Sequence, residues 1–197
     1  MNADVRSLLH QLEEQGRAHD ARETEHSRKV LNLEPDTAEI VSLLARGSHA
    51  RRVLEIGTSN GYSTIWLADA VAPADGSVIS IDRSPEKQNM ARENLLRAGL
   101  LERVDLRCGD ATEVIATLSG PFDFVFFDAD RIDAHKQLTL LLPKLAPSTF
   151  LVADNALSHP EEIANYLAMI GSLEHVQHIL IRVGKGLSVA LAAPLIE

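Results

Sequence analysis

The stretch VLEIGTSNGYS, from Val53 to Ser63, constrains the fold more than any other part of the chain. Its first residues, Val53–Ile56, are mostly apolar and partly β-branched, which is typical of a buried strand. Small residues and two glycines, Gly57 and Gly61, then break the pattern, and an apolar helical pattern begins directly afterwards. A strand, a glycine-rich turn and a helix in this order predict a ligand cradle at the carboxyl end of a strand in an open α/β sheet.

The letters of this turn argue against a phosphate ligand. A dinucleotide fingerprint reads G-x-G-x-x-G, whereas this turn reads E-x-G-x-S-x-G, with Glu55 before the first glycine and Ser59 between the two. We expect Glu55 to face the crevice, where its carboxylate would repel a pyrophosphate and attract an ammonium group. S-adenosylmethionine carries an ammonium and a sulfonium and no phosphate. The alternative is a plain connection that binds nothing, because short glycine motifs also arise by chance.

The chain after residue 52 alternates between strand and helix patterns. Strands are expected at Val53–Ile56, Ser77–Asp82, Val104–Arg107, Phe122–Phe127 and Thr149–Ala153, with helices at 61–72, 84–99, 111–118, 133–145 and 160–170. Five such units in series predict a parallel sheet with helices on both faces. Two further strand-like runs, 176–183 and 187–192, are joined by GKG, which is a hairpin signal. The pattern therefore predicts an α/β fold whose parallel sheet ends in an antiparallel hairpin.

The length of 197 residues and a hydrophobic content of 45% indicate about one domain with a substantial core. We expect a single domain over residues 1–197, in which a helical cover (1–50) packs on an α/β core (51–197). The N-terminus lacks the pattern of a signal peptide, and no apolar run is long enough for a membrane span. One cysteine, Cys108, cannot form an internal disulfide, which favours a reducing, cytoplasmic compartment. We expect its side chain to be buried.

A net charge of −9 bears on the partners of the chain. An acidic chain repels phosphate backbones, which argues against a nucleic acid as partner. A local basic patch could still be present on a chain whose net charge is negative. The charge therefore favours a small-molecule ligand without deciding the question.

Polar side chains follow two neighbouring strands of the expected sheet. Asp128 comes directly after the fourth strand, and Asp154 and Asn155 come directly after the fifth. Parallel neighbours end at one edge of a sheet, so two carboxylates and an amide oxygen are expected to converge beside Gly57. Oxygen ligands of this kind suit a hard divalent cation such as Mg²⁺. The alternative is that they are ordinary polar ends of buried strands.

Two further acidic residues, Asp82 and Asp110, follow the second and third strands. Asp82 is placed to accept hydrogen bonds from ribose hydroxyls, and Asp110 would lie near an adenine. Each has a simpler alternative as the cap of the helix that follows. For Asp110 capping is about as strongly favoured as ligand binding.

Together these motifs resemble the cation-dependent O-methyltransferases of the catechol and caffeoyl-CoA type. The resemblance covers about residues 35–193 and runs in order through LEIGTSNGYS, the acidic end of SVISID, CGDA, FDFVFFDAD, VADN and GKGLSVAL. It implies a Rossmann-like, doubly wound, mostly parallel seven-stranded sheet whose last strand is antiparallel, and a homodimer. It also implies methyl transfer from S-adenosylmethionine to a phenolic hydroxyl held on a divalent metal.

The resemblance assigns site residues by position. The metal would be held by Asp128, Asp154 and Asn155, and Asp128 would also take part in catalysis. The cofactor would be held by residues of the glycine-rich turn and of the following strand ends: Glu55, Gly57, Thr58, Ser59, Gly61, Tyr62, Ser63, Asp82, Arg83, Gly109, Asp110, Ala111 and Asp128.

One position departs from the family. The resemblance places a lysine, the general base, directly after FDAD, and this chain has Arg131 there. Arginine stays protonated in proteins, so it cannot remove a proton, but it can stabilise a phenolate. His135 and Lys136 lie about one helical turn further on and are alternative proton acceptors.

These observations leave three hypotheses. The first is a metal-assisted O-methyltransferase that acts on a small catechol-like or phenolic hydroxyl. The second keeps the cofactor and the metal but has an RNA-base hydroxyl as acceptor, against which the net charge argues. The third is an S-adenosylmethionine-binding protein with weakened catalysis, in which Arg131 marks the loss.

Overall fold

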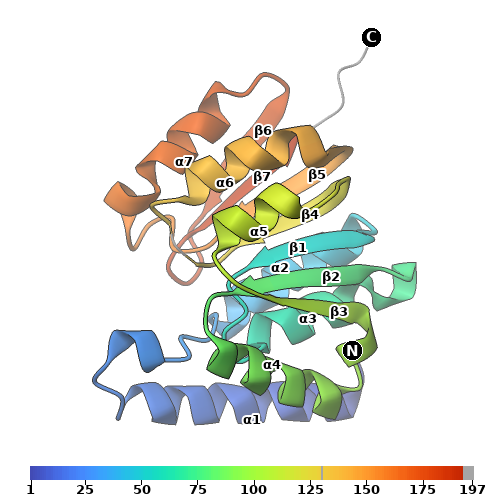
Figure 1. The fold of residues 1–197 in the computed structure, drawn as a ribbon, viewed down its shortest axis with the longest axis vertical. Coiled ribbons are helices and arrows are strands. Elements are labelled where there is room, and N and C mark those ends of the chain that lie inside the picture. The colour runs from blue at the N-terminus through green and yellow to red at the C-terminus, as the bar shows by residue number, and fades with distance from the viewer. Residues whose placement is uncertain (130, 193–197) are drawn as a thin grey trace.

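The computed structural model describes residues 1–129 and 131–192, which form one seven-stranded sheet between two layers of helices (Figure 1). The strands are β1 (Arg52–Ile56), β2 (Ser77–Asp82), β3 (Val104–Cys108), β4 (Phe122–Phe127), β5 (Leu145–Ala153), β6 (Val176–Ile181) and β7 (Leu187–Ala192). Their order across the sheet is β3-β2-β1-β4-β5-β7-β6. Strands β1 to β5 run parallel, and β7 is antiparallel to both β5 and β6. The predicted fold is confirmed.

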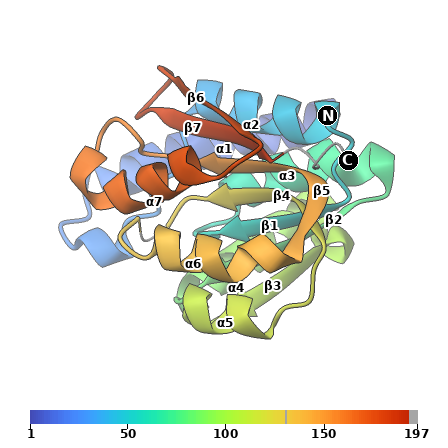
Figure 2. The same ribbon diagram turned by 90° about the horizontal axis from the view of Figure 1, so that it is seen from above.

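The helices cover both faces of the sheet (Figure 2). One layer consists of α1 (Ala3–Asp20), α2 (Pro35–Gly47), α3 (Tyr62–Val71) and α4 (Pro85–Ala98). The other consists of α5 (Ala111–Thr117), α6 (Ala134–Leu141) and α7 (Pro160–Ser172). Within the described part of the chain, none of these helices has the length and apolar character needed to cross a membrane.

Local capping chemistry sets where the helix after β2 begins and ends. Ser84 caps α4 by accepting a hydrogen bond from the Lys87 N–H at 3.2 Å, and Pro85 follows at the first helical position. Gly99, at a φ of 69°, ends the same helix. The N-cap places α4 directly after the carboxyl end of β2, so the residues between strand and helix stay at that edge of the sheet.

The register of the central strands brings their carboxyl ends level. The Asp128 N–H donates to the Ile56 carbonyl at 2.8 Å, and the Asp154 N–H donates to the Phe127 carbonyl at 3.0 Å. These bonds extend the β1–β4 and β4–β5 ladders by one residue. The ring of Phe127 packs against that of Tyr166 on α7, with 5.1 Å between centroids. The end of β4 is therefore fixed on both sides.

The structure corrects three details of the sequence interpretation. β5 begins at Leu145, four residues before the expected start, and it pairs across a register irregularity in β4. β6 ends at Ile181 and not at Val183. The Cys108 side chain is exposed and not buried, because β3 lies at the edge of the sheet, where one flank has no neighbouring strand.

Candidate functional site

The glycine-rich turn packs directly against the end of β4. Gly57 has a φ of +111°, and a Cβ built on it would lie 2.3 Å from the Asp128 carbonyl oxygen. Gly61 has a φ of +85°, and its Cβ would lie 3.0 Å from the Cα of Ala91 on α4. A left-handed backbone and a contact this close both require glycine at residue 57. The predicted cradle thus lies where the backbone of Gly57 contacts the backbone of Asp128.

Asp82, the last residue of β2, stabilises this turn through hydrogen bonds. Its Oδ2 accepts a hydrogen bond from the Ser59 N–H at 2.8 Å, and its Oδ1 accepts from the Ser84 N–H at 2.9 Å. The Ser59 hydroxyl donates to the Val30 carbonyl, so the segment between α1 and α2 lies over the turn. Asp82 therefore has a clear structural role, and each of its oxygens retains a lone pair for a further donor.

Glu55 does not face an open crevice, and this expectation is wrong. Its side chain is fully buried and accepts hydrogen bonds from the hydroxyls of Ser63 (2.6 Å), Thr64 (2.5 Å) and Ser80 (2.6 Å). Burial raises the pKa of Glu55 to about 7, although the three hydroxyls act to lower it. Thr58 extends the network, since its hydroxyl lies 2.7 Å from that of Ser80. Glu55 thus ties the turn and α3 to β2.

The raised pKa of Glu55 predicts a pH-dependent contribution to stability. Because the folded protein binds this proton more tightly than the unfolded chain, stability falls as the pH rises from about 4.5 to about 7. Glu55→Gln has no such pH-dependent loss. The difference in unfolding free energy between the variant and the wild type should therefore shift in favour of the variant by on the order of 3 kcal/mol between pH 4.5 and pH 7.5. Urea unfolding at pH 4.5 and 7.5 measures the gain. The exposed Glu102→Gln serves as control, and a gain no larger than that of the control would contradict the prediction.

Some of the remaining cofactor candidates are buried inside the fold, and others lie at the carboxyl edge of the sheet. Tyr62 belongs to the hydrophobic core, with 3% of its surface exposed, and Ser63 is committed to Glu55. Asp110 caps α5, which starts at Ala111, by accepting from the N–H groups of Thr112 (2.9 Å) and Glu113 (3.2 Å).

The capping alternative for Asp110 is therefore realised. Its exposed carboxylate still lies at the same edge of the sheet as Asp82, because β2 and β3 are paired in register up to Cys108. Gly109 and the exposed Arg83 follow those two strand ends. The role of each of these residues toward a cofactor stays a prediction.

Two carboxylates lie side by side at the ends of β4 and β5, as predicted. Burial raises the pKa of Asp128 well above its ordinary value, and the charge of Asp154 raises it further. Burial likewise raises the pKa of Asp154. Asn155, in the left-handed region at a φ of 65°, donates from Nδ2 to Asp154 Oδ2 at 2.9 Å. The structure therefore brings all three predicted metal ligands to one place.

The donor set fits a hard cation. Asp154 is 2% exposed, and its Oδ1 has no hydrogen-bond partner among the described residues. An ionised carboxylate that is buried with an unused oxygen is costly, and a bound cation would remove that cost. No three His, Cys, Asp or Glu side chains of residues 1–129 and 131–192 are grouped so as to hold a metal. The candidate set instead combines two carboxylates with one amide.

Sequence reasoning missed an ion pair beside these carboxylates. The Lys185 Nζ lies 3.1 Å from Glu34 Oε1, which joins the β6–β7 turn to the start of α2. The Lys185 charge lowers the pKa of both Asp128 and Asp154, whereas the Glu34 charge raises both. The only sequence signal was the GKG motif, which we read as a turn and nothing more.

Arg131 is held in place by a second residue that the sequence did not single out. Its Nε and Nη2 donate to one oxygen of Glu162, at 2.8 and 2.7 Å, in the first turn of α7. The two alternative proton acceptors have other partners. The Nζ of Lys136 lies 2.7 Å from Asp133 Oδ1, and the His135 Nδ1 lies 2.9 Å from the Ile132 carbonyl.

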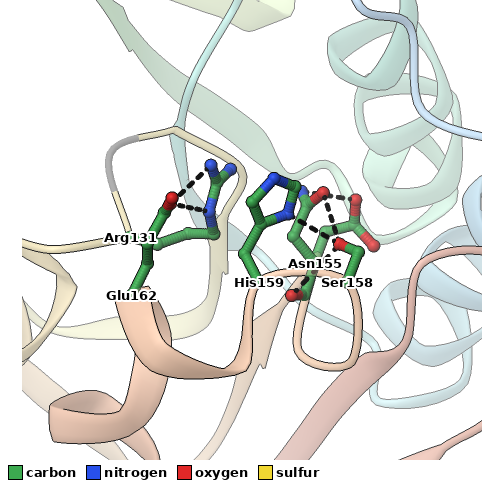
Figure 3. A network of polar contacts seen from close by, with 6 residues as sticks. Arg131, Asn155, Ser158, His159 and Glu162 are labelled. Atoms are coloured by element: carbon green, nitrogen blue, oxygen red, sulfur yellow. Dashed lines mark hydrogen bonds and ion pairs between the residues drawn. The ribbon is translucent and has the colours of Figure 1, made fainter.

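A short polar chain links Asn155 to the start of α7 (Figure 3). The Ser158 hydroxyl lies 3.3 Å from Asn155 Oδ1 and 2.8 Å from His159 Nδ1. Figure 3 shows the Arg131 guanidinium and the His159 imidazole pointing to the same side of the α7 N-terminus. Neither Ser158 nor His159 belongs to a motif, so only the structure brings them to the site.

Comparison with known proteins agrees with this geometry. The chain matches the model of the O-methyltransferase family over residues 3–190. Catechol O-methyltransferase from Niastella koreensis is 36% identical over 132 residues (65% of this chain and 59% of the relative). Catechol O-methyltransferase from Mycobacterium tuberculosis is 40% identical over 120 residues (60% and 54%). The matched part therefore spans somewhat more than half the length of each relative.

A solved structure agrees over nearly the whole chain. The O-methyltransferase from Bacillus cereus, in complex with SAH, has a TM-score of 0.81 at 28% identity and covers 94% of this chain and 90% of its own. The resemblance predicted from the sequence is confirmed at the level of family and fold.

Proposed function

Because the chain belongs to the O-methyltransferase family, we propose that it transfers a methyl group from S-adenosylmethionine to a hydroxyl of a small catechol-like or phenolic molecule, assisted by a divalent cation. The observation that carries the proposal is the pair of neighbouring carboxylates, half-buried Asp128 and buried Asp154, at adjacent strand ends beside Gly57. A methyl donor on the turn and a hydroxyl on the cation would then lie next to each other.

A cation held at this edge of the sheet would supply Lewis-acid chemistry to the acceptor. Asp128, Asp154 and Asn155 would hold Mg²⁺ or another divalent ion, which lowers the pKa of a hydroxyl that it binds and orients that hydroxyl. The Asp154 Oδ1 supports this assignment, since it accepts no hydrogen bond from residues 1–129 or 131–192 and the fold already fixes its position. The Lys185 charge lowers the pKa of both carboxyl groups, but its partner Glu34 acts in the opposite direction, so the ion pair leaves room for a cation to balance the cluster.

The cofactor would bind along the glycine-rich turn. Asp82 and the backbone from Gly57 to Ser59 offer hydrogen-bonding groups at the carboxyl edge of β1 and β2. Glu55 acts indirectly, because its bonds to Ser63 and Ser80 hold the turn in shape. Preorganisation of this kind lowers the cost of ordering a ligand.

Exposed aliphatic side chains support a small apolar acceptor. Ile132, next to Arg131, is 60% exposed, and Leu157, in the loop that carries Asn155, is 41% exposed. Both lie in the loops that bear the polar site residues, where they can cover the faces of a flat ring. Large exposed apolar side chains at a polar site are typical of ligand contacts. A homodimer and a cytoplasmic location stay predictions.

Calorimetric titration tests the proposal. We expect S-adenosylmethionine to bind with or without Mg²⁺, and dihydroxybenzoate to bind afterwards only when Mg²⁺ is present. Failure of S-adenosylmethionine to bind would contradict the assignment of the turn. Equal binding of dihydroxybenzoate with Mg²⁺ and with EDTA would contradict the role of Asp128, Asp154 and Asn155.

A further inference from the structure

The side chain of Arg131 is fixed at the site by Glu162. Two guanidinium nitrogens share one carboxylate oxygen, at 2.8 and 2.7 Å, and 25% of the arginine side chain is exposed. The two residues come from different segments, the loop after β4 and the first turn of α7. A guanidinium held by two bonds has a defined position, in contrast to a solvated surface arginine.

This fixed charge lies in the segments that carry the proposed cation ligands. Arg131 comes three residues after Asp128 in the loop after β4, and its partner Glu162 lies in the first turn of α7. The N–H of His159, the N-cap of that helix, donates to the Asn155 carbonyl at 3.2 Å. In Figure 3 the guanidinium points to the same side of the α7 N-terminus as the His159 imidazole. An acceptor oxygen near the cation would therefore lie near a second, permanent positive charge.

A permanent cation cannot accept a proton, but it can stabilise an anion. We propose that Arg131, positioned by Glu162, binds the acceptor as its oxyanion, so that the protein selects phenols acidic enough to ionise before methyl transfer. This inference rests on the proposed function. Arg131 would be the group that contacts the acceptor, and Glu162 would be a positioning residue.

The step balances without a protein base. The acceptor oxygen loses its proton to solvent on binding, and then supplies the electron pair of the new O–C bond. The C–S bond of the sulfonium breaks and its electron pair goes to sulfur, which leaves a neutral thioether. Because no side chain takes the proton during transfer, the acidity of the acceptor controls which molecules react.

The ionisation of a bound chromophore tests the inference without turnover. 4-Nitrocatechol changes its visible absorbance on ionisation, so its pKa can be read while it is bound with Mg²⁺ and S-adenosylhomocysteine, which cannot donate a methyl group. We expect Arg131→Met to raise the pKa of the bound probe by about 1–2 units, as expected for loss of a neighbouring opposite charge. The double variant Arg131→Met, Glu162→Gln separates loss of the cation from exposure of the Glu162 carboxylate.

Variants of Glu162 separate positioning from charge. Glu162→Gln keeps an oxygen that can accept from the guanidinium, so the pKa of the probe should stay near or below the wild-type value. Glu162→Ala removes that acceptor and should raise the pKa toward that of Arg131→Met. Glu161→Ala is the matched control, because it is the exposed glutamate next in sequence and should change nothing.

Each outcome decides the question. An unchanged probe pKa in both Arg131→Met and the double variant would overturn the inference while leaving the proposed function intact. An effect of Arg131→Met without any effect of Glu162→Ala would overturn the positioning role. Failure of the wild type to bind the probe would overturn the proposed function, and this inference with it.

Discussion

Replacement of Asp154 by asparagine is expected to abolish methyl transfer and, in the same protein, to stabilise the cation-free fold at neutral pH. The carboxylate is a proposed cation ligand, and a lost Lewis acid is worth several kcal/mol of transition-state stabilisation, or about a 1000-fold loss of rate. The stability gain arises because the substitution removes a buried charge. The Asp154 charge is buried beside Asp128, and asparagine has no charge to bury.

The sign of the stability effect follows from the pKa. Because the pKa of Asp154 is raised in the folded state, stability falls as the pH rises from about 4 to about 6 and stays lower above it. Asp154→Asn should therefore exceed the wild type by on the order of 1–3 kcal/mol at pH 7.5 and match it near pH 4. Urea unfolding in EDTA gives the stability, and initial rates with Mg²⁺ give the activity.

A matched control separates the site from a general effect of carboxylates. Asp105 is exposed on β3, and its Oδ2 lies 2.7 Å from Nη2 of Arg107 on the same strand. Asp105→Asn should change both stability and activity little, because exposed ion pairs contribute at most about 1 kcal/mol. If Asp154→Asn retained wild-type activity, or lost stability at pH 7.5, the cation-site assignment would be wrong.

Gly57→Ala is expected to be the most destabilising single-methyl substitution in the turn. Its Cβ would lie 2.3 Å from the Asp128 carbonyl oxygen and 2.7 Å from the carbonyl carbon, and both are backbone atoms that cannot rotate away. The residue also has a φ of +111°. Backbone strain and overpacking together should cost about 3–5 kcal/mol and displace the end of β4, so S-adenosylmethionine binding should be lost.

The control for this substitution is Gly99→Ala. Gly99 also has a positive φ, +69°, but a Cβ there would meet no atom within 4 Å. It should therefore cost only the left-handed strain, about 1–2 kcal/mol, with no effect on cofactor affinity. Chemical unfolding and calorimetry measure both quantities, and equal costs for the two alanine variants would refute the steric argument.

The sequence was sufficient to predict the features that follow from chain order. Asp128 and Asp154 each come directly after a strand, and parallel neighbours must end at one edge, so their convergence could be predicted without coordinates. The GKG hairpin gave β6 and β7 for a similar reason, since a short glycine turn joins antiparallel strands. Both predictions depend on local patterns plus a single rule of sheet geometry.

Features that depend on strand order or on side-chain direction could not be predicted in the same way. The neighbours of Glu55 in β1, Val53, Leu54 and Ile56, are all apolar, so no alternation showed which face Glu55 occupies or that three hydroxyls would bind it. Cys108 was misjudged because the pattern of β3 does not show that this strand is at an edge. Lys185 and Glu34 are 151 positions apart (185 − 34), and no periodicity connects them.

The turn between β6 and β7 has a consequence for a growing chain. Its Lys185 carbonyl accepts from the N–H groups of Leu157 and Ser158, both at 3.0 Å, and its ammonium pairs with Glu34. A nascent polypeptide that has been synthesised only through α7 already contains Gly57, Asp128, Asp154 and Asn155, but it lacks the Lys185 carbonyl that accepts from Leu157 and Ser158 and the Lys185 ammonium that pairs with Glu34. We therefore expect the Asn155 loop to take its final position only after the β6–β7 hairpin has been synthesised and has docked.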